Sequence, residues 1–533
     1  MYARQNLGIT LIALIITVIV MLILAGVAIS AIGNGGLIEQ VKKAADLTNQ
    51  ATQNEQVQIN DAVDILNNYP NGENNNTNNN KLGSTDGSWD GIANTPELMT
   101  GMTAVAWDSS GNEITPTTKE EWYNYAENRW ANAVTKDSSG NITGYWVWIP
   151  RYAYKIESNL YTSNFGKISV KFLQGATNKD SDGNTVSTTY PSVSGNAMTD
   201  YVVHPSFING TANDFANGEW DKELSGFWVA KYVAGFQASS IDTSGNLING
   251  ADTVKYSSLK YTAQYSSDNF ITNALSQDLT AANYMNTNMS YPVFKPQTYA
   301  YNIISPGDAY SISQEIKNAN SFYGFNNSET DSHQMKNSEW GAVVYLTQSQ
   351  YGRNGTEPSM NSLNLNNKDN KNIYAVTGFA GTGAGITDIT KVSGYNTPAG
   401  LLGSSTGNIT GVYDLNGCIW EYVTSYIENG DVGNTKLQQY ATSYATSETS
   451  TKYATVYPYA TNSNHNNASG TIAEYGAARY GDAIMETANI GGTTSGWNSD
   501  TSIIAWGDGG DIPMCARRRR LRFFFRTIWV VCI

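Results

Sequence analysis

The sequence predicts an α+β protein in which one long N-terminal helix precedes a domain with short strands and few helices. Three observations support this class. Residues 9–29 contain no charged side chain, and as a helix this run spans roughly 30 Å, the thickness of a bilayer core. Apolar residues then recur at helical spacing to about residue 67. From residue 89, short aromatic runs alternate with turns rich in Gly, Asn, Asp and Ser.

The N-terminal region divides into a leader at 1–8, a transmembrane helix at 9–29, a stalk helix at 30–69 and a polar linker at 70–88. A secretory signal peptide has a shorter apolar core, followed by its cleavage site. Arg4 in the leader favours a cytoplasmic N-terminus. We therefore expect a single-pass protein of the cell membrane with an extracellular globular part.

The junction between Gly8 and Ile9 resembles the N-terminus of type IV prepilins and pseudopilins. In that family a prepilin peptidase cleaves after the Gly of a short basic leader, and the exposed N-terminus, which carries the methylation motif, begins a hydrophobic helix. The resemblance implies processing at this junction, pilin-like subunits as partners and a surface fibre. Ala13 stands where the family usually has the Glu that pairs with a neighbouring subunit, which argues against polymerisation. A plain membrane anchor is the alternative.

The composition indicates an extracellular protein that makes its contacts through hydrogen bonds. Only 15% of the residues are charged, whereas Tyr occurs 34 times and Trp 13 times. The net charge of −14 argues against nucleic acid as a partner, because nucleic-acid binding needs a basic surface. Three Cys residues provide no disulfide framework.

Beyond the linker, we expect a small β-rich region at 89–144 and a larger domain at 145–514. Alternating and aromatic runs predict strands at 102–107, 131–135, 145–154 and 226–235. Residues 338–347 predict a helix with Ser338 as its N-cap and an apolar stripe.

The run Tyr-Asp-Leu-Asn-Gly-Cys-Ile-Trp-Glu-Tyr at 413–422 is the most specific internal motif. It resembles the Gly-Asn-Val-Trp-Glu-Trp signature of the formylglycine-generating enzyme (sulfatase-modifying factor) family, a branch of the C-type-lectin-like fold. Segments at 148–152, 227–232 and 337–340 resemble other family segments in the same order. The resemblance implies a C-type-lectin-like domain over 145–514. A prepilin-like N-terminus joined to such a domain resembles surface proteins of Gram-positive bacteria.

In the family this motif holds a structural calcium ion, and the matching residues are Asp414, Gly417, Ile419 and Glu421. Each can supply an oxygen from a carboxylate or a backbone carbonyl, which is what calcium requires. The alternative is a turn without metal, in which Glu421 accepts backbone N–H bonds and Asp414 acts as a cap.

The sequence favours binding over catalysis. The copper-binding Cys pair of the family's enzymes is not matched, because Cys418 lies inside the motif and Cys515 and Cys532 lie in a basic tail. His204, His333 and His465 have no metal-ligand spacing and are expected to be surface or structural residues. We expect a non-catalytic surface protein that binds a ligand or mediates adhesion. The alternatives are a minor pilin or pseudopilin subunit and, third, a formylglycine-generating-type oxidoreductase.

The candidate ligand-binding surface lies near the C-terminus and consists of Trp497, Asn498, Asp500, Trp506 and Asp508. Exposed Trp side chains beside Asn and Asp suit an extracellular glycan or a protein loop. The alternative places these Trp side chains in the core.

The tail at 515–533 contains six Arg and no acidic residue. Its composition suggests a shift of reading frame. The alternatives are a basic membrane-binding or anion-binding tail and an unusual last strand.

Overall fold

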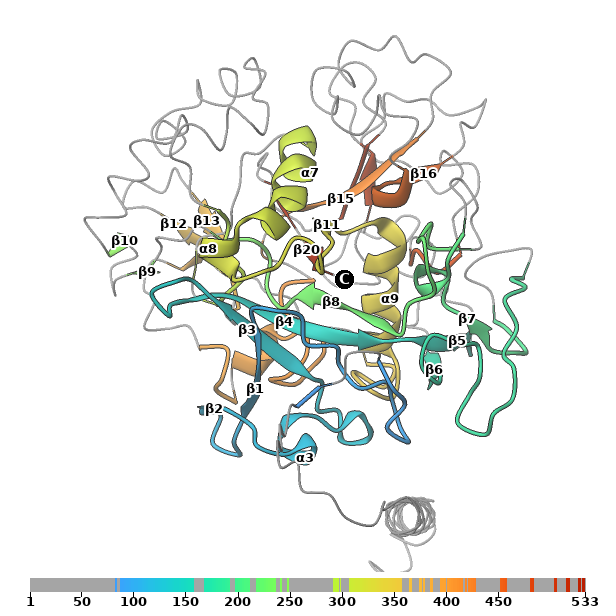
Figure 1. The fold of residues 1–533 in the computed structure, drawn as a ribbon. Coiled ribbons are helices and arrows are strands. Elements are labelled where there is room, and N and C mark those ends of the chain that lie inside the picture. The colour runs from blue at the N-terminus through green and yellow to red at the C-terminus, as the bar shows by residue number, and fades with distance from the viewer. Residues whose placement is uncertain are drawn as a thin grey trace, which may run out of the picture. The chain divides into compact units, whose positions relative to one another are not determined.

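A computed structural model gives the fold of the chain, which divides into two units, Met1–Asn79 and Asn80–Ile533 (Figure 1). All described residues belong to the second unit. They are residues 82–83, 87–157, 167–191, 197–210, 217–235, 240–241, 247–248, 291–296, 298, 306–356, 364–366, 373–375, 377–378, 384–386, 394–398, 400–415, 418, 420–427, 451–457, 480–483, 503–505, 514–517, 526–528 and 530–532.

In these ranges, no helix combines the length and the apolar character needed to cross a membrane. The predicted leader, transmembrane helix and stalk lie outside the described residues, as do Gly8 and Ile9.

The central element is a seven-stranded antiparallel sheet with the order β11-β20-β8-β4-β3-β1-β2 (Figure 1). Its strands are β1 (Met102–Trp107), β2 (Glu113–Ile114), β3 (Asn132–Lys136), β4 (Ile142–Pro150), β8 (Gly226–Ala230), β11 (Ser332–Gln334) and β20 (Val530–Cys532). The strands predicted at 102–107 and 131–135 are thus confirmed as β1 and β3. The strand predicted at 226–235 is shorter and ends at residue 230 in β8, and the one predicted at 145–154 is divided between β4 and a second strand that begins at Tyr152. The predicted boundary between 144 and 145 falls within β4, so residues on both sides of it share one sheet.

Four smaller sheets accompany the central one. They contain β5 (Tyr152–Ile156), β6 (Ile168–Phe172) and β7 (Val202–Val203); β9 (Ser240–Ile241) and β10 (Leu247–Ile248); β12 (Asn364–Asn366), β13 (Ile373–Ala375) and β14 (Ala384–Ile386); and β15 (Trp420–Ile427), β16 (Thr455–Tyr457), β17 (Ile503–Ala505), β18 (Met514–Arg517) and β19 (Arg526–Ile528).

The helices of the described part are few and short. They are α3 (Lys119–Trp122), α7 (Pro306–Glu315), α8 (Asn320–Tyr323) and α9 (Asn337–Gln348), with 3-10 turns η1 (Tyr125–Glu127), η2 (Pro205–Phe207), η4 (Ile316–Asn318), η6 (Gly400–Gly403) and η7 (Thr451–Tyr453). Sheets with few helices make this unit α+β, as the sequence predicted.

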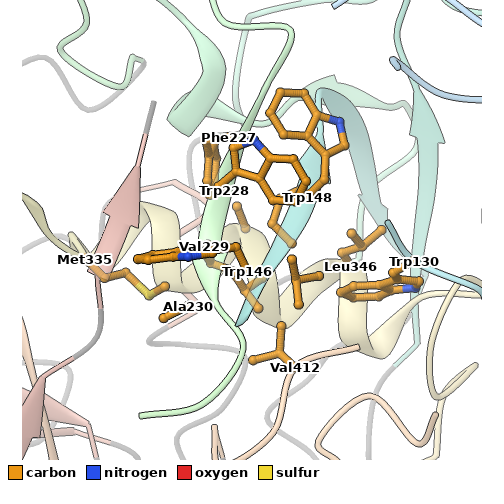
Figure 2. Close-up of a cluster of buried hydrophobic side chains, with 14 of the residues drawn as sticks. Trp130, Trp146, Trp148, Phe227, Trp228, Val229, Ala230, Met335, Leu346 and Val412 are labelled. Atoms are coloured by element: carbon orange, nitrogen blue, oxygen red, sulfur yellow. The ribbon is translucent and has the colours of Figure 1, made fainter. Parts of the chain in front are cut away.

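The core is built on aromatic side chains of the central sheet (Figure 2). Strand β4 is buried at eight of its nine positions, which explains its nearly continuous apolar sequence. Trp146 lies opposite Ala133 on β3 and Ala230 on β8, so small neighbours accommodate the large ring. Trp148 faces Trp228 on β8, with ring centroids 5.3 Å apart. Small residues opposite Trp146 and the paired Trp148 and Trp228 rings thus form the centre of the core.

Helix α9 is confirmed, but it differs from the prediction at its start and in its environment. The N-cap is Lys336 rather than Ser338, and the Lys336 backbone N–H donates to the Glu339 carboxylate at 2.8 Å. All twelve helix residues are buried, where the sequence suggested one apolar stripe. A Cβ on Gly341 would lie 1.8 Å from the Gly481 carbonyl oxygen, so only glycine permits this approach. The helix is thus an internal element that packs against β6, η2 and β15.

The basic tail contributes strands to two sheets. Val530–Cys532 (β20) lie between β8 and β11 in the central sheet, and β18 and β19 both pair with β15. The pairing of β20 matches the alternative of a last strand for these three residues. The shift of reading frame stays a hypothesis.

Candidate functional site

A cavity of about 630 Å³ opens beside the central sheet. Four segments supply most of its walls: Glu97 and Met99, residues 220–226 before and at the start of β8, residues 327–331 before β11, and Lys452 with Tyr453 in η7. The volume is in the range typical of small-molecule sites. The central sheet and η7 therefore bring distant parts of the chain to one place.

Lys452 joins two of these walls. Its ammonium group lies 2.8 Å from the Asp221 carboxylate and 3.1 Å from the Asp331 carboxylate. The Tyr453 hydroxyl donates to Asp331 at 3.0 Å, and Lys317 lies 3.6 Å from the same carboxylate. Burial alone raises the pKa of Asp331, but the charges of His333, Lys452 and Lys317 outweigh it and lower the pKa. Asp331 is therefore held as a carboxylate at the cavity wall.

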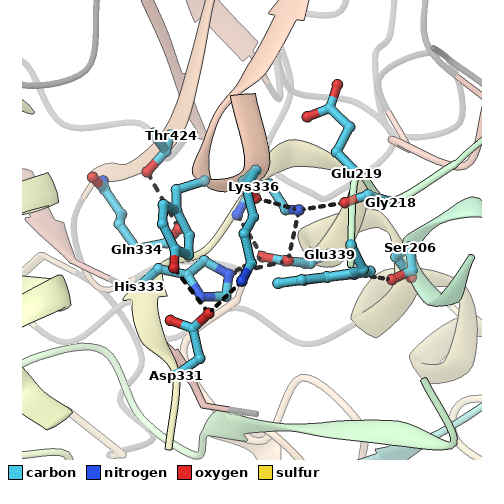
Figure 3. Close-up of polar contacts among 12 residues, drawn as sticks. Ser206, Gly218, Glu219, Asp331, His333, Gln334, Lys336, Glu339 and Thr424 are labelled. Carbon is cyan, nitrogen blue, oxygen red and sulfur yellow. Dashed lines mark hydrogen bonds and ion pairs between the residues drawn. The ribbon is translucent and has the colours of Figure 1, made fainter. Parts of the chain in front are cut away.

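A buried polar network lies behind this wall (Figure 3). The Glu339 carboxylate oxygens each lie 3.1 Å from His333 Nε2, and one lies 3.4 Å from the Lys336 ammonium. Lys336 Nζ also donates to the Lys452 carbonyl at 2.9 Å and lies 3.9 Å above the Trp220 ring. The network thus ties η7 to the start of α9 and fixes the backbone that carries Lys452 and Tyr453.

A second buried cation stabilises the wall formed by residues 220–226. The Arg151 guanidinium, which is fully buried, lies 2.6 Å from the Glu223 carboxylate. It also donates to the Phe207 carbonyl at 2.8 Å and the Leu224 carbonyl at 3.0 Å. Burial lowers the pKa of Arg151, and the Glu223 charge opposes that effect. Glu223 is therefore a fixed acceptor and not a mobile surface carboxylate.

The structure describes two of the four residues of the predicted calcium turn. Asp414 is fully buried with φ of 64°, and its two carboxylate oxygens each lie 3.1 Å from the Gly378 backbone nitrogen, whose N–H donates to them. Glu421 is buried in β15, while Gly417 and Ile419 lie outside the described residues. Two carboxylates fit the chemistry of calcium, although the described part of the chain brings together no group of three or more His, Cys, Asp or Glu side chains.

The predicted ligand-binding residues Trp497, Asn498, Asp500, Trp506 and Asp508 lie outside the described residues. Sequence reasoning missed the cavity residues. Asp221 and Lys452 are 231 residues apart, so no local spacing signals their contact. The only local signal is the charged run Asp221-Lys-Glu directly after Trp220.

His204 and His333 are buried, which matches one of the two expected environments, surface or structural, and His465 lies outside the described residues. His204 is fully buried; its Nε2 lies 3.0 Å from the Gly481 carbonyl oxygen and its Nδ1 lies 2.9 Å from the Ser206 hydroxyl. Burial lowers its pKa to about 3. The imidazole is therefore neutral in the folded protein over most of the acid range.

This burial predicts a loss of stability in acid. Below pH 6.5 the unfolded chain protonates His204 and the folded protein does not, so stability falls as the pH drops from about 6.5 towards 3, by up to about 4 kcal/mol. The free energy of unfolding of His204→Gln should lack this pH-dependent loss, because the variant has no imidazole to protonate. Urea unfolding measures the difference in the free energy of unfolding between the wild type and His204→Gln. This difference should be constant above pH 6.5 and shrink below it. A difference that does not change with pH would contradict the assignment.

A comparison with known protein-family models finds no match to this chain, and a comparison with curated proteins finds none either. The two family resemblances therefore stay proposals that depend on the motifs themselves.

Proposed function

We propose that the chain is a prepilin-like, membrane-anchored protein of the cell surface whose C-type-lectin-like domain binds an extracellular ligand without catalysing a reaction. The observation that carries this proposal is the cavity, because its polar groups are held in place by ion pairs and hydrogen bonds before any ligand arrives. Such preorganisation lowers the cost of binding.

The pairing of the charges supports binding rather than proton transfer. Asp331 is held by two lysines, Asp221 by Lys452, and Glu223 by Arg151. A general acid or base needs a pKa close to the working pH, and the pKa of Asp331 is shifted downwards, away from neutrality. These carboxylates are suited to accept hydrogen bonds from a bound ligand.

The apolar run at 9–29 and the Gly8–Ile9 junction support the membrane anchor and its processing. N-terminal sequencing of the mature protein tests both. A start at Ile9 would establish prepilin-type cleavage, and an intact Met1 would leave a plain anchor.

A minor pilin or pseudopilin subunit is the second candidate, favoured by the same junction. Crosslinking in intact cells distinguishes the two functions. A ladder of products containing pilin-like subunits would favour the fibre, whereas monomers alone would favour a tethered binding domain.

Calcium at the 413–422 turn is part of this proposal and gives a separate prediction. We expect EDTA to lower the midpoint of thermal unfolding and added calcium to restore it, because a bound ion stabilises only the folded state. Magnesium is the matched control and should restore less, since it prefers a smaller octahedral site. An unchanged midpoint in EDTA would remove calcium from the account.

A further inference from the structure

The charged side chains that line the cavity indicate the chemical class of its ligand. Five carboxylates and three lysine side chains line it, and most of these charges are already neutralised by partners within the protein. The Glu97 carboxylate accepts from the Ser225 hydroxyl, and Glu329 accepts from Thr100 at 2.7 Å. A strongly charged ligand would have to displace these partners. A neutral ligand with many hydroxyl groups can use both signs of charge as they stand.

Lys452 with Asp221 and Asp331 offers a donor flanked by two acceptors. The Asp221 side chain is 83% exposed, so its carboxylate can accept further bonds from a ligand while it holds the lysine. Neighbouring hydroxyls of a sugar ring each donate and accept, which matches this alternation. Hydrogen bonds to charged groups are also the stronger ones, which suits a neutral ligand.

Tyr453 supplies a half-buried aromatic ring at the same wall. Its hydroxyl is fixed by Asp331, its ring packs on His333 at a centroid distance of 5.5 Å, and the Lys452 ammonium lies 5.3 Å from the ring centroid. Tyr453 lines the cavity, and an aromatic ring with polar neighbours is typical of sites that stack on the apolar face of a sugar.

The Thr330 hydroxyl is a second, independent indication that the cavity binds a ligand. The residue lines the cavity and is 4% exposed, and its hydroxyl oxygen is buried without a hydrogen-bond partner among the described residues. A buried hydroxyl without a partner costs about 1–3 kcal/mol, so a bound ligand that pairs with it would recover that cost.

We infer that the cavity is a binding site for a neutral saccharide, with Tyr453 as the stacking ring, Lys452 and the two aspartates as the hydroxyl-binding group, and Thr330 as an additional partner. The inference rests on the proposed binding function and specifies its ligand.

The test applies the full-length protein, in detergent, to an array of neutral oligosaccharides beside sialylated and sulfated ones, and then measures the affinity for the best neutral binder. We expect neutral glycans to bind. Tyr453→Leu should weaken binding about tenfold or more, and Tyr453→Phe should weaken it less because the ring remains.

Thr330→Val separates binding from folding. It removes an unpartnered hydroxyl at nearly constant shape, so stability should hold or rise while glycan affinity falls. Thr347→Val is the matched control: Thr347 is also buried with an unpartnered hydroxyl, but it lies in α9 and does not line the cavity. The glycan affinity of Thr347→Val should equal that of the wild type.

The outcomes distinguish the two proposals. Neutral-glycan binding that is unchanged in Tyr453→Leu and Thr330→Val, or a preference for acidic glycans, would overturn the inference and leave the binding function. If the chain binds a protein ligand through Tyr453 and binds no glycan, the saccharide inference would likewise be overturned and the binding function would stand. A chain that binds nothing through the cavity would overturn both.

Discussion

Replacing Glu339 by glutamine is expected to lower the free energy of unfolding by about 3–5 kcal/mol, because removal of one partner leaves buried charge uncompensated. The Lys336 side chain is 2% exposed, and its ammonium lies 3.4 Å from the Glu339 carboxylate, which also contacts His333 and the Lys336 backbone N–H. Burial alone raises the pKa of Glu339, but the charges of His333 and Lys336 lower it overall. The carboxylate is therefore ionised and holds the network behind the cavity together.

Urea unfolding at neutral pH measures this loss. The control is Glu157→Gln, which removes the partly exposed Lys155–Glu157 pair at 3.2 Å and should change stability by about 0–1 kcal/mol. Because the folded pKa of Glu339 is lowered, its contribution is complete above the unfolded pKa and is lost as the pH falls below it. The difference in the free energy of unfolding between Glu339→Gln and the wild type should therefore become smaller in acid. Equal, small losses for both variants would contradict the role of Glu339.

Replacing Trp146 by alanine should cost about 3–5 kcal/mol, since a large buried ring is removed from a close-packed core. Trp146 is fully buried, its indole N–H donates to the Thr135 hydroxyl at 3.1 Å, and its ring lies 5.2 Å from Phe294 and 5.8 Å from Phe325. Its opposite neighbours are alanines, which cannot fill the space that the ring leaves.

Trp89→Ala is the matched control for this substitution. Trp89 is only partly buried at the edge of the same cluster. Its replacement by alanine should therefore lower the free energy of unfolding clearly less than Trp146→Ala does. The urea midpoint and slope of each variant measure the effect. A loss for Trp146→Ala no larger than for Trp89→Ala would show that the cluster is not the core of the unit.

The sequence predicted the elements whose signals are local. Strand β1 (Met102–Trp107) is an apolar run that ends in an Asp-Ser-Ser-Gly-Asn turn, where the Asp108 carboxylate accepts the Ser110 and Asn112 N–H groups. Helix α9 was also recognised, but its N-cap was not. Ser338 is a good N-cap by residue type, whereas the contact of Glu339 with the Lys336 N–H begins the helix earlier.

The cavity could not be predicted, because its chemistry depends on contacts between distant segments. Lys452 follows a polar, Ser- and Thr-rich run, and nothing near it in sequence indicates that it contacts Asp221 and Asp331. The motif residue Asp414 shows the same limit. Its N–H donor is Gly378, 36 residues earlier. Local patterns predict elements, and tertiary packing decides which polar groups meet.

The most direct test of a surface-displayed binding site uses intact cells that produce the full-length chain. Antibody staining measures display, and a fluorescent neutral oligosaccharide chosen from the array measures binding on the same cells. We predict that wild-type cells bind the oligosaccharide and that Tyr453→Leu cells, with equal antibody staining, lose most of that binding. Equal oligosaccharide binding by both, or an absence of surface staining for the wild type, would contradict the account.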